Sequence, residues 1–115
     1  MFSRLFGKAD GSKPAEIDHD EFVALQRDGE CVVVDVRETH EFVAGHIPGA
    51  LNLPLSRFDP GELPAGRQVV LVCQAGGRSA TALRRATAAG VTDIRHYAAG
   101  TGGWRARGGP VAFDD

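Results

Sequence analysis

The stretch best suited to chemistry is VVLVCQAGGRSA, residues 69–80, in which Cys73 ends an apolar run. Glycines follow this cysteine, and glycine lets a backbone curl so that its N–H groups point inward and bind an anion. The charge of Arg78 and the N-terminus of the next helix favour an anion at the same place. We therefore predict that Cys73 is a catalytic thiolate. The predicted substrate-binding residues beside it are Gln74, Ala75, Gly76, Gly77, Arg78 and Ser79.

Two plainer interpretations of this stretch stay open. A cysteine at the end of a strand is often a small buried apolar residue, and a glycine-rich loop can bind an anion without chemistry. Four residues lie between Cys73 and Arg78. The loop of cysteine-dependent phosphatases is one residue longer, because it wraps a tetrahedral phosphoryl group. The shorter loop therefore favours attack on a sulfane sulfur.

Four further residues are candidates to support the site, namely Asp35, Arg37, His46 and Trp104. Asp35 and Arg37 flank the end of a predicted strand, and the favoured interpretation is an ion pair that orders the chain there. His46 could act as a general base, although a histidine in the turn GHIPGA more often orders a loop through hydrogen bonds. Trp104 could line the pocket, but packing against the sheet is at least as well supported, because tryptophan buries a large area.

The other cysteine and the other histidines indicate no second site. Cys31 begins a predicted strand whereas Cys73 ends one, so in a parallel sheet their sulfurs would lie on the order of 20 Å apart. A disulfide cannot span that distance, and we do not expect Cys31 to be a resolving thiol. Because His19, His40 and His96 lack ligand spacing with any acid or cysteine, we predict no metal site.

The 115-residue chain has the size and composition of one globular domain. It is 43% hydrophobic and 24% charged, and its net charge of −2 gives no electrostatic reason to bind nucleic acid or a membrane surface. No segment approaches the roughly 18–20 apolar residues of a membrane span. Residues 1–14 are predicted to be a flexible leader, with a weak amphipathic anchor as the alternative. We expect one domain over residues 15–115 and a cytoplasmic location.

Buried strands alternate with helices along this domain. Continuous β-branched runs predict strands that are covered on both faces. Strands are predicted at 31–36, 68–73 and 93–98, a short apolar segment at 50–53, and helices or helical turns at 17–29, 38–46, 79–90 and 100–110. This alternation predicts an α/β fold with a parallel sheet. Ligands of such sheets bind beyond the carboxyl ends of the strands.

Capping residues mark the ends of two of these helices. Asp18 is expected to cap the first helix, with Glu21 three residues later as in a capping box, and Gly29 is expected to end it. Ser79 is the predicted cap of the helix that follows the cysteine loop.

Three stretches, in order along the chain, resemble the single-domain rhodaneses, a family of sulfurtransferases. They are VVDVRETHEFVAGHIPGALNLPL at 33–55, VCQAGGRSA at 72–80 and AGTGGWRARGGPV at 99–111, and the resemblance covers about residues 16–112. It implies a rhodanese-like three-layer fold with a five-stranded parallel sheet flanked by helices. It also implies that Cys73 takes a sulfane sulfur as a persulfide, which the N–H groups from Gln74 to Ser79 would hold while Arg78 aids the donor. No metal or organic cofactor is implied.

The sequence departs from the family in two places. Ala99 and Gly100 stand where the family usually has two adjacent glycines, so the local turn can differ. Gln74 and Ala75 stand where some thiosulfate-specific relatives have basic residues, which weakens the case for thiosulfate as the donor.

The leading hypothesis is a thiosulfate sulfurtransferase-like enzyme. Its donor would be a small sulfane-sulfur anion, and its acceptor would be cyanide in an assay and a thiol or a protein in the cell. The alternatives are a sulfur carrier that serves a relay protein, with little turnover on free thiosulfate, and a regulatory binding module. A cysteine phosphatase or arsenate reductase is the last alternative.

Overall fold

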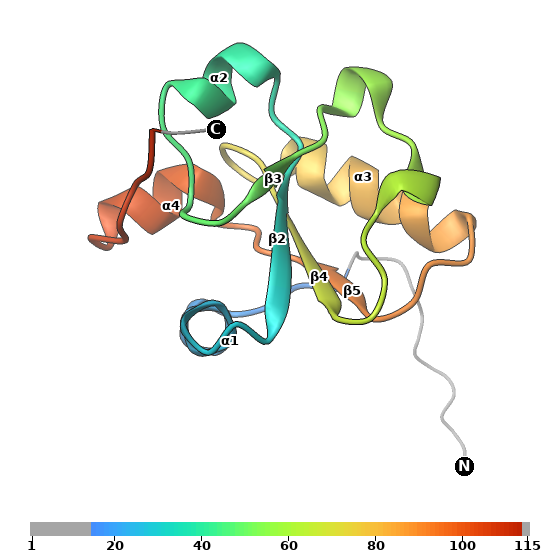
Figure 1. The fold of residues 1–115 in the computed structure, drawn as a ribbon, viewed down its shortest axis with the longest axis horizontal. Coiled ribbons are helices and arrows are strands. Elements are labelled where there is room, and N and C mark those ends of the chain that lie inside the picture. The colour runs from blue at the N-terminus through green and yellow to red at the C-terminus, as the bar shows by residue number, and fades with distance from the viewer. Residues whose placement is uncertain (1–14, 114–115) are drawn as a thin grey trace.

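A computed structural model describes residues 15–113. The predicted leader at 1–14, together with residues 114 and 115, lies outside the described residues. The centre of the fold is a sheet of four parallel strands in the order β3-β2-β4-β5 (Figure 1). These strands are β2 (Cys31–Asp35), β3 (Leu51–Asn52), β4 (Gln68–Val72) and β5 (Ile94–His96). The predicted α/β fold with a parallel sheet flanked by helices is confirmed.

The expected fifth strand is reduced to a single bridge within the described residues. Glu16 pairs with His96 in the parallel sense at the free edge of β5. The Ile17 N–H donates to the His96 carbonyl at 3.0 Å, and the His96 N–H donates to the Ala15 carbonyl at 3.0 Å. The pairing stops there because Asp18 already caps the first helix, so the chain leaves the sheet edge after Ile17.

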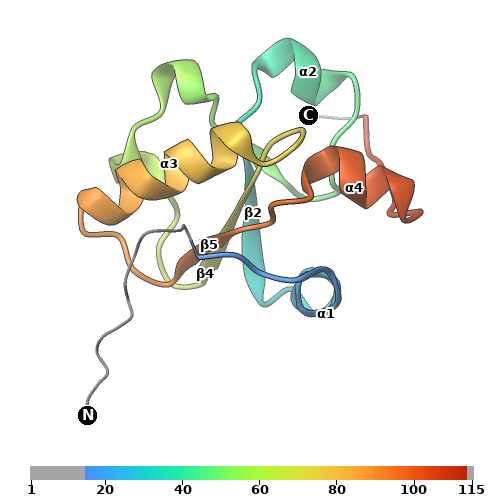
Figure 2. The ribbon, with the colours of Figure 1, turned by 180° about the vertical axis from the view of Figure 1, so that it is seen from behind.

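Helices cover both faces of the sheet, which gives three layers (Figures 1 and 2). One layer holds α1 (His19–Arg27) and α4 (Gly100–Ala106). The opposite layer holds α3 (Gly77–Ala88) with the 3-10 turns η1 (Leu55–Arg57) and η2 (Pro60–Glu62). The short helix α2 (Thr39–Val43) lies at the end of the sheet where β2 ends (Figure 1). No helix within residues 15–113 has the length and apolar character to cross a membrane.

Successive residues of each buried strand face opposite layers. Val70 of β4 packs in the cluster that contains Phe22 and Trp104, whereas the next residue, Leu71, packs with Leu83 of α3. This two-sided burial explains why the strand sequences are continuously apolar rather than alternating.

The predicted cap of α1 is confirmed, and the predicted cap of α3 is wrong. The Asp18 carboxylate accepts a hydrogen bond from the Glu21 N–H at 2.8 Å, and Gly29 follows the helix with φ +70°. The α3 helix begins at Gly77 with Gly76 as its N-cap, three residues before the predicted cap. The left-handed conformation of Gly76, with φ +101°, turns the chain into the helix early. Ser79 therefore lies in the first turn of α3.

Candidate active site

Cys73 lies directly after β4, at the carboxyl edge of the sheet, where the loop to α3 begins. The residue is buried, with 1% of its surface exposed. Its sulfur accepts hydrogen bonds from the N–H groups of Gly76 at 3.2 Å and Ser79 at 3.3 Å. The Ser79 hydroxyl oxygen is 3.6 Å away from the same sulfur. The loop therefore surrounds the sulfur with donors, an arrangement that stabilises a negative charge.

One of the two loop glycines is required by the geometry. Gly76 has φ +101°, and a Cβ atom there would lie 2.5 Å from the Ala98 carbonyl oxygen. Gly77 has open space where a Cβ atom would stand. Of these two glycines, only Gly76 is therefore required for the close approach of the loop to Ala98.

The surroundings of Cys73 lower the pKa of its thiol. Burial is the largest single influence and raises the pKa. The N–H and hydroxyl of Ser79, together with the N–H groups of Ala75 and Gly76, stabilise the thiolate and outweigh burial. Cys31 shows the contrasting case, because burial raises the pKa of its thiol and only Arg67 opposes it. The two thiols of the chain therefore differ in the direction of their shifts.

The first turn of α4 holds the cysteine loop through backbone hydrogen bonds. The Thr101 N–H donates to the Cys73 carbonyl at 2.8 Å, and the Gly102 N–H donates to the Gln74 carbonyl at 3.1 Å. The Thr101 hydroxyl also donates to the Gln74 side-chain oxygen at 3.0 Å. Gly100 has φ +69°, and a Cβ atom there would collide with the carbonyl oxygens of Gln74 and Cys73. Close approach of these two segments therefore requires glycine at position 100.

The backbone at Ala99 does not require glycine. Ala99 has an ordinary helical conformation, with φ −66°, so it does not need to be glycine. Its methyl group occupies the space where a side chain at Gly103 would begin, 2.5 Å from that Cβ position. A glycine one turn along the helix thus makes room for the alanine.

Arg78 is directed to a carboxylate rather than to the sulfur. Its guanidinium donates two hydrogen bonds to Glu41 of α2, at 2.7 Å and 3.1 Å. This pairing lowers the pKa of Glu41 to about 2, although partial burial opposes the shift. The side chains of Arg78 and Glu41 are 36% and 28% exposed, so the pair is partly open to solvent. Sequence analysis missed Glu41, because the α2 helix supplies the partner from a distant segment.

Comparison with known proteins decides the family. Residues 18–107 match the family model of the rhodanese-like domain. The chain belongs to the rhodanese-like domain family. The cysteine loop, the first turn of α4 and the Arg78–Glu41 pair all lie within the matched residues.

Relatives of this rhodanese-like domain include both uncharacterized proteins and a sulfurtransferase. An uncharacterized protein from Synechocystis sp. is 43% identical over 89 residues, which is 76% of this chain and 50% of that protein. The chain therefore spans about half the length of that relative. The human thiosulfate:glutathione sulfurtransferase is 32% identical over 100 residues, covering 73% of this chain and 87% of that protein. A rhodanese-related protein from Thermoplasma volcanium superimposes with a TM-score of 0.78 at 26% identity, covering 87% of this chain and 99% of that one.

Asp35 and Arg37 form a buried ion pair in the turn between β2 and α2 of the rhodanese-like domain. The Arg37 guanidinium donates to both Asp35 carboxylate oxygens, at 2.8–3.1 Å. It also donates to the Gly45 carbonyl at 2.8 Å, and the Arg37 N–H donates to Asp35 at 2.9 Å. These contacts tie β2 to the chain that follows α2, so they order the turn beside the site.

His46 and Trp104 make hydrogen bonds to backbone carbonyls away from Cys73. His46 Nδ1 donates to the Phe42 carbonyl at 2.8 Å, and the rings of His46 and Phe42 stack with their centroids 3.8 Å apart. Trp104 Nε1 donates to the Pro110 carbonyl at 2.7 Å, and its ring packs in the core on the α1 and α4 face. The structure thus places both side chains in the packing of this rhodanese-like domain.

His96 is the second residue near the site that sequence analysis missed. It is 2% exposed, on β5, and its Nδ1 lies 2.8 Å from the Ser79 hydroxyl oxygen. Burial lowers the pKa of His96, with Glu16 opposing and Arg84 adding to the shift. A buried histidine needs a polar partner, but the three-residue strand also carries Arg95, so no local signal in the sequence indicated that His96 would be buried beside Ser79.

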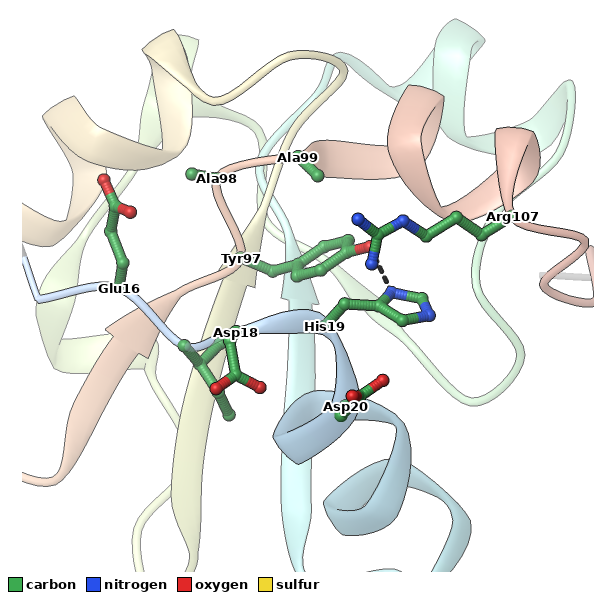
Figure 3. A pocket seen from close by; sticks show the side chains of 9 residues that line it. Glu16, Asp18, His19, Asp20, Tyr97, Ala98, Ala99 and Arg107 are labelled. Carbon is green, nitrogen blue, oxygen red and sulfur yellow. Dashed lines mark hydrogen bonds between the residues drawn. The ribbon is translucent and has the colours of Figure 1, made fainter.

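A separate cavity of about 350 Å³ opens on the face of the rhodanese-like domain that carries α1 (Figure 3). Within it the His19 imidazole and the Tyr97 hydroxyl form a hydrogen bond of 2.8 Å, and the Arg107 guanidinium points toward them (Figure 3). The residues that line the cavity are Glu16, Ile17, Asp18, His19, Asp20, Tyr97, Ala98, Ala99 and Arg107. Cys73 is not among them. The described residues contain no cluster of histidine, cysteine and acidic side chains that could hold a metal ion.

Proposed function

We propose that this rhodanese-like domain is a sulfurtransferase that cycles through a persulfide on Cys73. The observation that carries the proposal is the Cys73 sulfur, which receives hydrogen bonds from the loop N–H groups of Gly76 and Ser79. Such donors stabilise an anionic sulfur, both in the free thiolate and in a persulfide. The likeness to the human thiosulfate:glutathione sulfurtransferase supports the same chemistry.

The reaction has two steps. The Cys73 thiolate attacks the sulfane sulfur of the donor, so that a new S–S bond forms while the donor's own bond to that sulfur breaks. The electron pair of the broken bond leaves with the rest of the donor, as sulfite when the donor is thiosulfate. A nucleophilic acceptor then attacks the outer sulfur and releases the Cys73 thiolate. The residues from Gln74 to Ser79 hold the anion, and Asp35, Arg37, His46 and Trp104 support the loop by ordering its surroundings.

A sulfur carrier is the second candidate, because the charge on Arg78 is already shared with Glu41. A free anionic donor has to compete with that carboxylate, whereas a protein donor can supply its own contacts. The carrier would accept sulfur from a relay protein and turn over little with free thiosulfate.

The cytoplasmic location stays a prediction.

Turnover distinguishes the candidates. Thiosulfate is supplied with cyanide or with glutathione, and product formation is measured for the wild type, Cys73→Ser and Cys31→Ser. The enzyme proposal predicts many product molecules per chain for the wild type and Cys31→Ser, and none for Cys73→Ser. Product limited to one sulfur per chain supports the carrier. Hydrolysis of an aryl phosphate that is lost in Cys73→Ser overturns both in favour of a phosphatase.

A further inference from the structure

The Ser79 hydroxyl lies between three polar groups. Its oxygen is 2.8 Å from His96 Nδ1, 3.2 Å from the Gly76 carbonyl oxygen and 3.6 Å from the Cys73 sulfur. A hydroxyl has one hydrogen to donate and two lone pairs that accept. Which of the three groups receives that single hydrogen therefore depends on which of the others donates to Ser79.

The burial of His96 indicates which of its nitrogens carries the proton. Within residues 15–113, His96 Nε2 is buried and has no hydrogen-bond partner. A buried N–H without an acceptor is rarer than a buried acceptor without a donor. The neutral ring thus carries its proton on Nδ1. The charged groups that act on the ring are Glu16 at the sheet edge and Arg84 on α3, and burial keeps the imidazole neutral.

This tautomer leaves the Ser79 hydrogen available to the sulfur. Because Nδ1–H donates to the Ser79 oxygen, the hydroxyl hydrogen cannot be held on His96. It points to the Gly76 carbonyl while Cys73 is a thiol, whose S–H donates to the second lone pair of Ser79. When Cys73 is a thiolate or a persulfide anion, the sulfur can only accept, and the hydrogen turns to it. In the other tautomer, Nδ1 has no hydrogen and accepts a hydrogen bond from the Ser79 hydroxyl. The hydroxyl hydrogen would then point to His96 and not to the sulfur.

We propose that His96 is a positioning residue that acts through Ser79 to stabilise the anionic sulfur of Cys73. The inference rests on the proposed sulfur-transfer function for its role in turnover, but its effect on the thiol exists in the resting protein. No proton is transferred to His96 in either step. The ring only fixes the direction in which the Ser79 hydroxyl donates.

The test is a titration of the Cys73 thiolate in a set of variants. Thiolate absorbance is followed against pH, with Cys73→Ser subtracted to remove Cys31 and tyrosine. His96→Phe keeps a ring but has no donor. It should raise the pKa of Cys73 by about one unit, which is the size of shift expected when the thiolate loses one hydrogen bond, here that of the Ser79 hydroxyl. His96→Asn offers a side-chain N–H near the position of Nδ1 and should restore most of the shift.

Coupling to Ser79 separates this role from a purely structural one. Ser79→Ala should raise the pKa of Cys73 at least as much as His96→Phe does. The double variant should show no additional shift, because the path through the hydroxyl is already broken. Additive shifts, or a Cys73 pKa that His96→Phe leaves unchanged, would overturn the proposal.

A measurement on the wild type covers the case in which a variant does not fold. The ¹⁵N chemical shifts of the His96 ring distinguish the two neutral tautomers, and Nδ1 is expected to carry the proton. A proton on Nε2 contradicts the proposal. The titration of Cys73 and the ¹⁵N shifts of His96 are both measured on the protein without a sulfur donor. They therefore test the role of His96 even if no donor reacts, whereas a failure of sulfur transfer is detected by the turnover assay.

Discussion

At the scale of single residues, the two cysteines show how environment decides reactivity. Burial alone raises the pKa of a thiol, as at Cys31. Cys73 is also buried, yet donors from Ser79, Ala75 and Gly76 reverse the direction of its shift. The thiolate is the reactive form of a cysteine, so this environment favours reaction at Cys73 over Cys31.

The first prediction concerns the pH dependence of the two thiols. The alkylation rate of Cys73 by iodoacetamide should reach its plateau at a lower pH than that of Cys31. Trypsin separates the two thiols into residues 68–78 and 28–37, so mass spectrometry follows each one in the same sample. A Cys73 profile at or above that of Cys31 would contradict the assigned environment.

The same shift has a consequence for stability. The folded pKa of Cys73 lies below its unfolded value, so the thiolate contributes stability above the unfolded pKa, and this contribution is lost as the pH falls through the folded pKa.

The second prediction concerns the carboxylate that holds Arg78. Glu41→Gln removes the competing charge, so free thiosulfate should bind more tightly and its KM should fall by up to about fivefold, the worth of a partly exposed ion pair. Steady-state rates at varied thiosulfate measure this. Glu21→Gln is the matched control, since Glu21 pairs with Arg95 at 2.7 Å outside the loop. An equal fall in that control, or no fall in Glu41→Gln, would refute the role of Glu41.

The third prediction tests the buried ion pair beside the site. Arg37→Met leaves the Asp35 carboxylate buried without its partner, and we expect a loss of about 3–5 kcal/mol in the free energy of unfolding. Arg95→Met breaks an exposed pair and should cost about 1 kcal/mol or less. Urea denaturation compares the two variants, and equal costs would show that the Asp35–Arg37 pair does not order the turn.

At the scale of elements, α4 determines where the cysteine loop lies. Its first N–H groups hold the carbonyls of Cys73 and Gln74, and the close approach requires that Gly100 has no side chain. The loop is therefore positioned by an element from which it is separated in the sequence by one helix, α3, and one strand, β5. Substitutions in the first turn of α4 should therefore change the position of the cysteine loop and of the Cys73 sulfur.

The fourth prediction compares two glycines with similar backbone conformations. Gly90 has φ +93° and open space around it, so Gly90→Ala should cost only about 1–2 kcal/mol of backbone strain. Gly100→Ala adds a collision with two carbonyl oxygens, and we expect a loss of about 3 kcal/mol or more. Thermal or urea unfolding measures both. Similar losses in the two variants would mean that α4 does not press on the loop.

At the scale of the whole molecule, the sequence was sufficient for the architecture. The apolar runs at Cys31–Asp35 and Gln68–Val72 are the paired central strands, and the capping residue Asp18 starts the first helix. The fifth strand was overestimated because a pairing of one residue at the sheet edge has no signature of its own in the sequence.

The candidate site was predicted only where its residues are neighbours in the sequence. Glycines beside Cys73 announced a loop of N–H donors, but the partners from other elements had no local signal. Glu41 reaches Arg78 from α2, and His96 reaches Ser79 from β5. The start of α3 at Gly77 was also missed, because the backbone conformation of Gly76 depends on contact with Ala98. Tertiary contacts of this kind cannot be read from local patterns.

The measurement that tests the central claim most directly is the intact mass of the protein after incubation with thiosulfate and other sulfane-sulfur donors. We predict a gain of one sulfur atom in the wild type and in Cys31→Ser, carried by the peptide 68–78 and removed by cyanide or a thiol. Cys73→Ser should gain nothing. A wild-type mass that stays unchanged with every donor, or a gain that persists in Cys73→Ser, would contradict sulfur transfer through Cys73.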